Sequence, residues 1–311
     1  MTPAPKVPLQ ALAPAKINLG LFVGPPRADG RHELVSVMQS ISLADELTLE
    51  AAPADATGDE VLCPGVAGAP AENLAARALA AFRAATGWDA PPLRLKIDKR
   101  IPVAAGLGGG SADAAAALRL ATAASGLGDE SLLLELAADL GADVPAQVRP
   151  GRWLATGAGE ILEALPDPVA PIGVLVLPLA QGLSTAAVYA EADRRGKLRS
   201  AAFLGERRGA LHQAFDLGMS LHTDPELLRN DLEASARALC PEIRTALKEA
   251  REVGAEPAFL SGSGPTTIGL FPRTNGLAAA ERAVAGLAGR SPMPVAAHTV
   301  GADFAGVRGL T

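Results

Sequence analysis

The segment from Pro102 to Asp113 carries four glycines within positions 106–110 and runs directly into an alanine-rich stretch. Glycine can adopt positive-φ conformations that are closed to other residues, so successive backbone N–H groups can turn toward one anion. Ser111 and Asp113 stand where a helix would begin, and no proline follows before Pro145. Because a helix N-terminus offers unpaired N–H groups and a positive dipole end, the sequence predicts a polyphosphate-binding loop here.

Two common glycine motifs do not fit this segment. A P-loop has Lys and then Ser or Thr directly after its last glycine, whereas Ser111-Ala112 follows here. The dinucleotide fingerprint would place its third glycine at position 111 and needs a strand immediately before it, but the nearest strand-like run, Leu93–Asp98, lies several residues upstream. A glycine-rich turn that only opens a buried helix remains the alternative.

The first half of the chain mixes strands with helices. Ala15–Val23 alternates apolar and polar residues, which predicts a strand with Lys16 and Asn18 side by side on its polar face. We read Ala52–Pro70 as a loop. Further strands are predicted at Leu34–Ser42, Glu46–Glu50 and Leu93–Asp98, and helices at Asn73–Thr86 closed by Gly87, after the glycine loop, and at Glu130–Leu140. This pattern is typical of an α+β fold.

Two polar side chains lie in predicted turns. Asp143 is held between Gly141 and Pro145, which end the preceding helix, and capping the next short turn is its alternative role. His32 follows the Asp29-Gly30 turn. Its imidazole ring could stack on a planar base, or it could have no functional role.

Beyond Arg149-Pro150-Gly151 the pattern restarts, so we predict two domains, residues 1–150 and 151–311, for a chain of 311 residues. A second glycine-serine turn, Leu260–Thr267, is predicted to be a hairpin that can also face a phosphate. In the second half of the chain, a few predicted strands alternate with predicted helices, which suggests an open sheet with helices on one face. The strands are predicted at Ile172–Leu177, Ala258–Ser261, Thr267–Phe271 and Val295–Val300, and the helices at Ser184–Arg194, Gly205–Asp216, Pro225–Leu239, Glu242–Val253 and Gly276–Ala288.

Composition excludes several classes of partner. A net charge of −6 without a basic stripe argues against a nucleic-acid partner, and no uncharged apolar run is long enough for a membrane span. Cys63 and Cys240 lack metal-ligand spacing and cannot form a disulfide framework, which favours a reducing, cytoplasmic location. The first residues also lack the pattern of a signal peptide. The sequence gives no indication of an oligomeric state.

Three motifs stand in a fixed order: Pro14–Leu19, the glycine loop, and Ser261–Pro265. Together they resemble the three signatures of the GHMP kinase superfamily, whose members phosphorylate small alcohols and amines. Further pieces resemble the branch of the 4-diphosphocytidyl-2-C-methyl-D-erythritol kinases of the non-mevalonate isoprenoid route, and the resemblance covers most of the chain. These pieces are Ala28–His32, Ile97–Pro102, Leu140–Pro145 and Arg229–Glu233.

The resemblance implies a two-domain α+β fold, with a ribosomal-S5-like N-terminal domain that holds ATP and a ferredoxin-like C-terminal domain. It implies transfer of the γ-phosphoryl of ATP, with Mg²⁺, to the 2-hydroxyl of a cytidylated sugar alcohol that binds in the cleft between the domains. Asp143 would be the catalytic base assisted by Lys16, Asn18 would orient the substrate, and His32 would contact the cytosine. The implied ATP-binding residues are Pro102, Val103, Ala104, Ala105, Gly106, Leu107, Gly108, Gly109, Gly110, Ser111 and Ala112, with Ser111 also the candidate Mg²⁺ ligand.

Two positions depart from the branch. Arg31 replaces a common tyrosine, so an aromatic wall of the cytosine pocket is missing or replaced by a guanidinium stack, and Ala112 replaces a second serine. The alternatives are a homoserine or mevalonate-pathway kinase of the same superfamily, and a nucleotide-binding module without catalysis.

Overall fold

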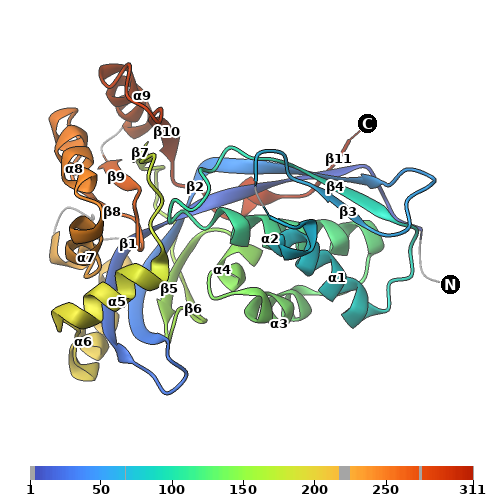
Figure 1. Cartoon of the computed structure of the whole chain (residues 1–311), viewed down its shortest axis with the longest axis horizontal. Helices are drawn as coiled ribbons and strands as arrows, with labels where there is room; N and C mark the ends of the chain where they lie inside the picture. Colours follow the sequence, from blue (N-terminus) through green and yellow to red (C-terminus); the bar gives the residue numbers. More distant parts are fainter. Residues whose placement is uncertain (1–3, 67, 217–224, 273–274, 311) are drawn as a thin grey trace.

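The larger sheet of the molecule is built on two long antiparallel strands, β1 (Leu9–Pro26) and β2 (His32–Ala51). The structure is a computed structural model and describes residues 4–66, 68–216, 225–272 and 275–310. The strands predicted at Leu34–Ser42 and Glu46–Glu50 are both parts of β2, because Ala44 and Asp45 between them still pair with β1. This long ribbon extends from the N-terminal helices toward the C-terminal ones (Figure 1).

Five further strands complete this sheet within the described residues. Its order is β11-β1-β2-β4-β3, and the hairpin β5-β6 pairs with β2 beside this path. The loop predicted at Ala52–Pro70 therefore contains a short strand, and the hairpin was not predicted at all. The division at residue 150 stays a prediction, but three strands that follow it belong to this first sheet. The bounds are β3 (Glu60–Leu62), β4 (Leu93–Asp98), β5 (Arg152–Thr156), β6 (Ile161–Leu165) and β11 (Arg308–Gly309).

Four helices cover one face of this sheet (Figure 1): α1 (Leu74–Thr86), α2 (Gly109–Ser125), α3 (Glu130–Leu140) and α4 (Val144–Val148). The predicted ends of α1 are confirmed, since Asn73 accepts a hydrogen bond from the Ala75 N–H at 2.9 Å and Gly87 is left-handed. The alanines at 114–117 are buried, and their small side chains let α2 lie close to α1 and β1.

The second sheet has the order β10-β7-β9-β8, with all neighbours antiparallel. Strand β7 is buried on both faces: Val174 and Val176 pack with Ile17 and Leu19 of β1, whereas Leu175 packs toward the outer helices. Its four strands are all close to the predicted ones. The bounds are β7 (Gly173–Leu177), β8 (Ala258–Leu260), β9 (Thr267–Phe271), β10 (Val295–His298), and the outer helices are α8 (Glu242–Glu252) and α9 (Gly276–Gly286).

One predicted helix, Pro225–Leu239, is interrupted at residues 229–232. There the N–H of Leu21 donates to the Arg229 carbonyl and the N–H of Asp231 donates to the Leu21 carbonyl, both at 2.9 Å, so the segment is tied to β1. The remaining elements are α5 (Thr185–Arg195), α6 (Ala201–Asp216), α7 (Glu233–Leu239), and the 3₁₀ helices η1 (Pro70–Glu72), η2 (Pro225–Leu228) and η3 (Ala302–Ala305). The predicted α+β class is confirmed. No helix in the described ranges is long and apolar enough to cross a bilayer.

Candidate active site

The glycine loop and the second glycine-serine turn lie against each other. The turn is the hairpin connection between β8 and β9, as predicted. A Cβ atom on Gly106 would stand 2.8 Å from the Gly264 carbonyl oxygen, so only glycine permits this approach. The Ser261 hydroxyl accepts from the Asn18 N–H at 3.4 Å and donates to the Gly106 carbonyl at 3.5 Å. The three motifs of the sequence therefore meet at one place.

Lys16 of strand β1 contacts the glycine loop through its backbone and Asn18 and Asp143 through its side chain. Its N–H donates to the Leu107 carbonyl at 2.9 Å, which fixes β1 against the glycine loop. Its ammonium lies 2.8 Å from the Asn18 Oδ1 atom and 3.3 Å from an oxygen of Asp143. The Lys16 side chain is 9% exposed and that of Asp143 is 34% exposed, so the carboxylate is the more solvent-exposed member of the pair. The amide of Asn18 is held in turn by the Ser36 hydroxyl at 2.8 Å.

Asp143 is the residue immediately before α4, and its side chain makes no capping hydrogen bond with that helix. Asp143 therefore does not act as a side-chain cap of α4. The Val144 N–H instead donates to the Gly141 carbonyl at 3.1 Å, which holds the turn. The carboxylate is left facing Lys16 and a cavity.

The start of α2 differs from the prediction by two residues, because the helix begins at Gly109 after the left-handed Gly108. Ser111 thus lies in the first helical turn and lines the cavity, together with Gly106 and Gly108. Asp113 is turned inward and buried. The other predicted ATP-binding residues divide by exposure: Ala105, Leu107 and Ala112 are buried, Pro102 and Gly109 are half-buried, and Val103, Ala104 and Gly110 are exposed.

A buried ion cluster supports the glycine loop from behind. The Lys99 ammonium lies 2.8 Å from Asp113 and also binds Asp45, which is fully buried and accepts from the N–H groups of Arg100 and Ile101 at 2.6 and 2.8 Å. Burial raises the pKa of Asp113 to about 7, with the Asp45 charge adding to the shift and Lys99 opposing it.

This raised pKa predicts the pH dependence of stability. A carboxyl with a higher pKa in the folded state than in the unfolded state binds extra protons when folded, so its contribution to stability is lost as pH rises from about 4 to about 7. We expect Asp113→Asn to remove this loss. In urea unfolding at pH 5, 6, 7 and 8, the free energy of unfolding of the variant minus that of the wild type should increase up to pH 7 and then level off. A difference independent of pH would contradict the assignment.

Lys16, Asn18 and Asp143 line a cavity of about 770 Å³ that also contains His32. His32 is 8% exposed, and its Nε2 atom lies 2.8 Å from an oxygen of Asp193. The ring centroid of Tyr189 is 4.9 Å from that of His32. The structure thus brings all four predicted catalytic and substrate-binding residues to one cavity.

Tyr189 and Asp193 were missed by the sequence reasoning. They lie one turn apart on α5, so both reach the same cavity. Tyr189 is the one tyrosine in the whole chain, which is the signal that could have drawn attention to it. Burial, with the charge of Asp143, raises the pKa of Tyr189 to about 12, so the phenol is neutral at physiological pH. Arg31 borders the cavity too, but its guanidinium is tied to Asp29 at 3.0 Å.

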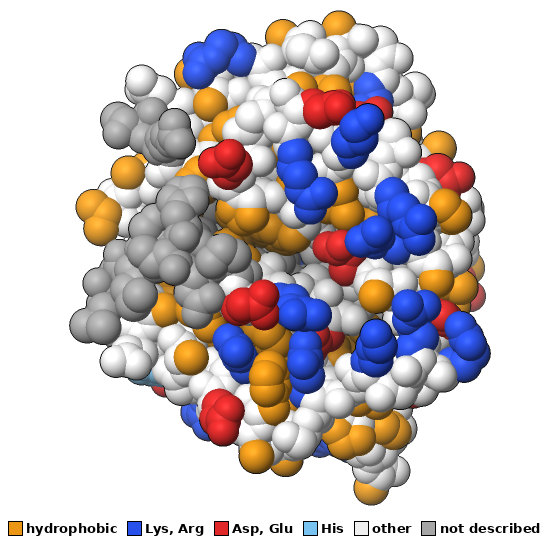
Figure 2. Space-filling view, turned by 90° about the vertical axis from the view of Figure 1, so that its left-hand side faces the viewer, with side chains coloured by type: hydrophobic (Ala, Val, Ile, Leu, Met, Phe, Trp, Pro, Cys, Tyr) orange, Lys and Arg blue, Asp and Glu red, His pale blue; other side chains and the backbone are white. Residues whose placement is uncertain are grey.

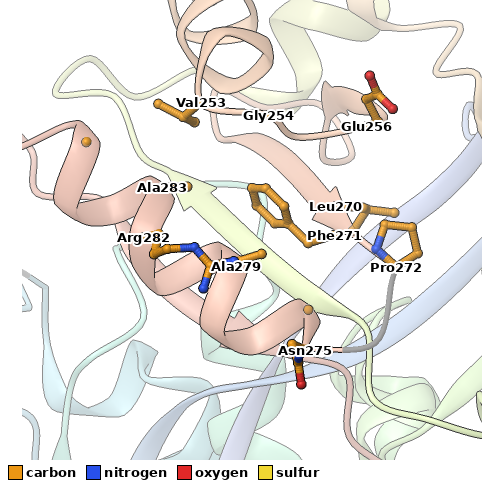
Figure 3. Close-up of a pocket in the computed structure, with 12 residues that line it drawn as sticks. Val253, Gly254, Glu256, Leu270, Phe271, Pro272, Asn275, Ala279, Arg282 and Ala283 are labelled. Carbon is orange, nitrogen blue, oxygen red and sulfur yellow. The ribbon is translucent and has the colours of Figure 1, made fainter.

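Among the other cavities that contain none of the predicted site residues, two are lined mainly by residues of the C-terminal part of the chain. One, of about 590 Å³, lies among the end of α8, β9 and α9, where Phe271 and Arg282 line it (Figure 3). The other is a groove beside α5 and α7. On the face of the molecule that carries the C-terminal helices, Lys and Arg side chains gather with acidic ones between them (Figure 2). Arg199 and Arg237 of this groove pair with Asp231 and Glu233.

Comparison with known proteins gives consistent matches. Residues 73–151 match the GHMP kinases N terminal domain and residues 210–288 the GHMP kinases C terminal domain. The chain is 41% identical over 288 residues to the 4-diphosphocytidyl-2-C-methyl-D-erythritol kinase of Anaeromyxobacter dehalogenans (strain 2CP-1 / ATCC BAA-258), covering 91% of this chain and 86% of that protein. It is 42% identical over 288 residues to the protein of the same name from Nocardia farcinica (strain IFM 10152), covering 90% and 91%.

Solved structures agree with these relatives. A crystal structure of 4-(cytidine 5'-diphospho)-2C-methyl-D-erythritol kinase matches with a TM-score of 0.75 at 33% identity, covering 94% of this chain and 99% of that one. A homoserine kinase from Cytophaga hutchinsonii ATCC 33406 matches with a TM-score of 0.70 over 97% of both chains, but at 16% identity it shows similarity of fold alone.

Proposed function

This chain belongs to the 4-diphosphocytidyl-2-C-methyl-D-erythritol kinase family of GHMP kinases, and we propose that it phosphorylates the 2-hydroxyl of that cytidylated alcohol with ATP. It is an ATP-dependent phosphotransferase, and the proposed step belongs to non-mevalonate isoprenoid precursor synthesis. The observation that carries the proposal is the meeting of Lys16, Asp143 and the two glycine turns at a cavity that also holds His32 beside Tyr189.

In the proposed reaction Asp143 accepts the proton of the acceptor hydroxyl as that oxygen attacks the γ-phosphorus. Its carboxylate suits this role because it is partly exposed in the cavity and is not used as a helix cap. Lys16, 3.3 Å away, balances negative charge on the transferring phosphoryl group. Since phosphoryl transfer has a loose transition state, most of the rate gain comes from positioning by these residues and by the glycine loop.

The proposed ATP site lies on the glycine loop and the start of α2, within the proposed N-terminal domain of residues 1–150. Mg²⁺ supplies charge neutralisation of the phosphates there. The described residues contain no cluster of three or more His, Cys, Asp or Glu side chains suited to a metal, and Asp113 is occupied by Lys99. An ion there would be held mainly by phosphates and water, and the Ser111 hydroxyl, which lines the cavity, would be its protein ligand.

The proposed cytosine site is formed by His32 and Tyr189. His32 is buried and Tyr189 is half-buried, and both lie at the end of the cavity formed by α5 and the first residue of β2. Asp193 accepts a hydrogen bond from a protonated Nε2 of His32 and so fixes the orientation of the imidazole ring. Tyr189 supplies an aromatic face where Arg31 does not, because the Arg31 guanidinium is held by Asp29.

We predict that Tyr189→Leu raises the KM for the cytidylated alcohol by about 10-fold, the loss expected from one base-stacking contact. The KM for ATP should stay within about two-fold, because the phosphate loops are untouched, and Tyr189→Phe should keep the wild-type KM. Steady-state kinetics with each substrate varied in turn measure both constants. Equal rises in the two KM values would count against a cytosine site at Tyr189.

The function itself is tested by coupled ADP release. Purified protein is incubated with Mg·ATP and, in parallel, with the cytidylated alcohol, homoserine or mevalonate. ADP release only with the cytidylated alcohol is the expected result. Release with homoserine or mevalonate would make the chain a different GHMP kinase, and release with none of the three would leave a nucleotide-binding module.

A further inference from the structure

A single arginine in the middle of α2 contacts the backbone of two other elements. Arg119 donates from Nη1 to the Gln147 carbonyl at 2.5 Å and to the Val148 carbonyl at 3.4 Å, and from Nη2 to the Leu12 carbonyl at 3.0 Å. All these acceptors are backbone oxygens. No carboxylate pairs with Arg119 in the part of the chain that the structure describes, so this guanidinium holds backbone rather than balancing a charge.

The three elements joined by Arg119 are those that carry the proposed catalytic groups. Helix α2 follows directly from the glycine loop, β1 carries Lys16, and Asp143 is the residue before α4. A second bond links two of these elements, α4 and β1, because the Gln147 amide donates to the Pro14 carbonyl at 3.2 Å. Helix α4 has only five residues, about 7 Å of helix, so a shift at its C-terminal end moves Asp143 at the other end.

The chemistry of this contact is suited to holding a short helix. The last carbonyls of a helix have no partner within it and form the negative end of its dipole, so a cation with several donors stabilises them. Burial lowers the pKa of Arg119 to about 10, which still leaves the guanidinium charged at neutral pH. The buried Nε–H of Arg119 has no hydrogen-bond partner among the described residues, so the guanidinium is held by its bonds to the three carbonyls.

We propose that Arg119 is a positioning residue that sets Asp143 relative to Lys16 by fixing α4 and β1 to α2. The inference rests on the proposed function, because it takes Asp143 and Lys16 as the catalytic pair. Arg119 does not line the substrate cavity. Its loss should therefore reduce kcat and leave both KM values nearly unchanged, since misplacement of a catalytic group by about 1 Å can cost about 100-fold in rate.

The test compares Arg119→Met and Arg119→Lys with Arg83→Met. Arg83 is the control, because it also donates to three backbone carbonyls, of Trp88, Ala90 and Pro91, besides pairing with Asp59, but lies on α1 away from the cavity. We expect Arg119→Met to lower kcat by about 10- to 100-fold with both KM values within about two-fold, and Arg119→Lys to recover part of the rate. Arg83→Met should reduce thermal stability and keep the wild-type kcat.

Equal kcat values for Arg119→Met and Arg83→Met would overturn the proposal, as would rises in both KM values that account for the loss of activity. If Arg119→Met does not fold, Gln147→Met removes the second link between α4 and β1, and a wild-type kcat in that variant would also overturn it. A wild-type enzyme that does not phosphorylate the cytidylated alcohol would refute the proposed function and this inference together, whereas normal wild-type turnover with an unaffected Arg119→Met refutes the inference alone.

Discussion

Replacing Asp143 with asparagine should lower kcat by about 10²- to 10⁴-fold, the range that a well-placed general base contributes. Asparagine has the same size but cannot accept the hydroxyl proton. The fold should be retained, because Asp143 makes no capping bond and is 34% exposed. Lys16 also keeps its 2.8 Å bond to Asn18 when the carboxylate is neutralised. The loss should therefore be confined to the chemical step.

Rapid-quench measurements of phosphoryl transfer with saturating substrates would report this step directly. Asp139→Asn is a suitable control, because that residue is exposed on the neighbouring helix α3 and does not line the cavity. The control should keep the wild-type rate. Near-normal transfer by Asp143→Asn would remove Asp143 from the catalytic role.

Lys16→Met should lower kcat by about 10²- to 10³-fold, as expected when one preorganised donor to transition-state charge is lost. Methionine keeps most of the apolar length of the side chain in a place that is 9% exposed. The substitution leaves the Asn18 Oδ1 atom without its 2.8 Å partner, so some stability is lost as well. The rate loss should exceed what the loss of stability explains.

Circular dichroism melting and kcat, both measured below the melting transition, separate these two effects. Lys96→Met provides the comparison, because Lys96 is a half-exposed lysine on β4 that pairs with Glu50 at the surface. It should change neither kcat nor the folded spectrum. A folded Lys16→Met enzyme with a kcat within a few-fold of the wild type would mean that the ammonium does not stabilise the transferring phosphoryl group.

The sequence predicts local structure best where the signal lies within the element itself. The ends of α1 follow from Asn73 and Gly87, which cap it directly, and α3 has its predicted bounds, with Asp129 capping its first turn. The GHMP kinase fold, expected from three separated motifs, is confirmed by the matches to both family domains and to the solved structures. Residues 229–232 are different: the Asn230 Oδ1 atom accepts from the Leu232 N–H at 2.9 Å, and pairing with Leu21 of β1 ties the segment to the sheet.

The parts of the site that were missed depend on tertiary packing. Tyr189 reaches His32 only because α5 lies beside the turn between β1 and β2, and no local pattern shows this. Asp113 was expected at the start of the phosphate-binding helix, yet it is turned toward Lys99 because the helix begins two residues earlier. The raised pKa of Asp113 is likewise a consequence of burial and of charges brought from distant parts of the chain.

The proposed site directs the γ-phosphoryl of ATP to one hydroxyl of a cytidylated alcohol. The most direct measurement is ³¹P nuclear magnetic resonance of the product formed by the wild-type protein from Mg·ATP and 4-diphosphocytidyl-2-C-methylerythritol, with carbon–phosphorus couplings used to locate the new phosphate. We expect ADP and one new phosphomonoester, coupled to the carbons around position 2 of the methylerythritol. Inorganic phosphate as the only new signal, or a phosphomonoester on another carbon, would contradict it.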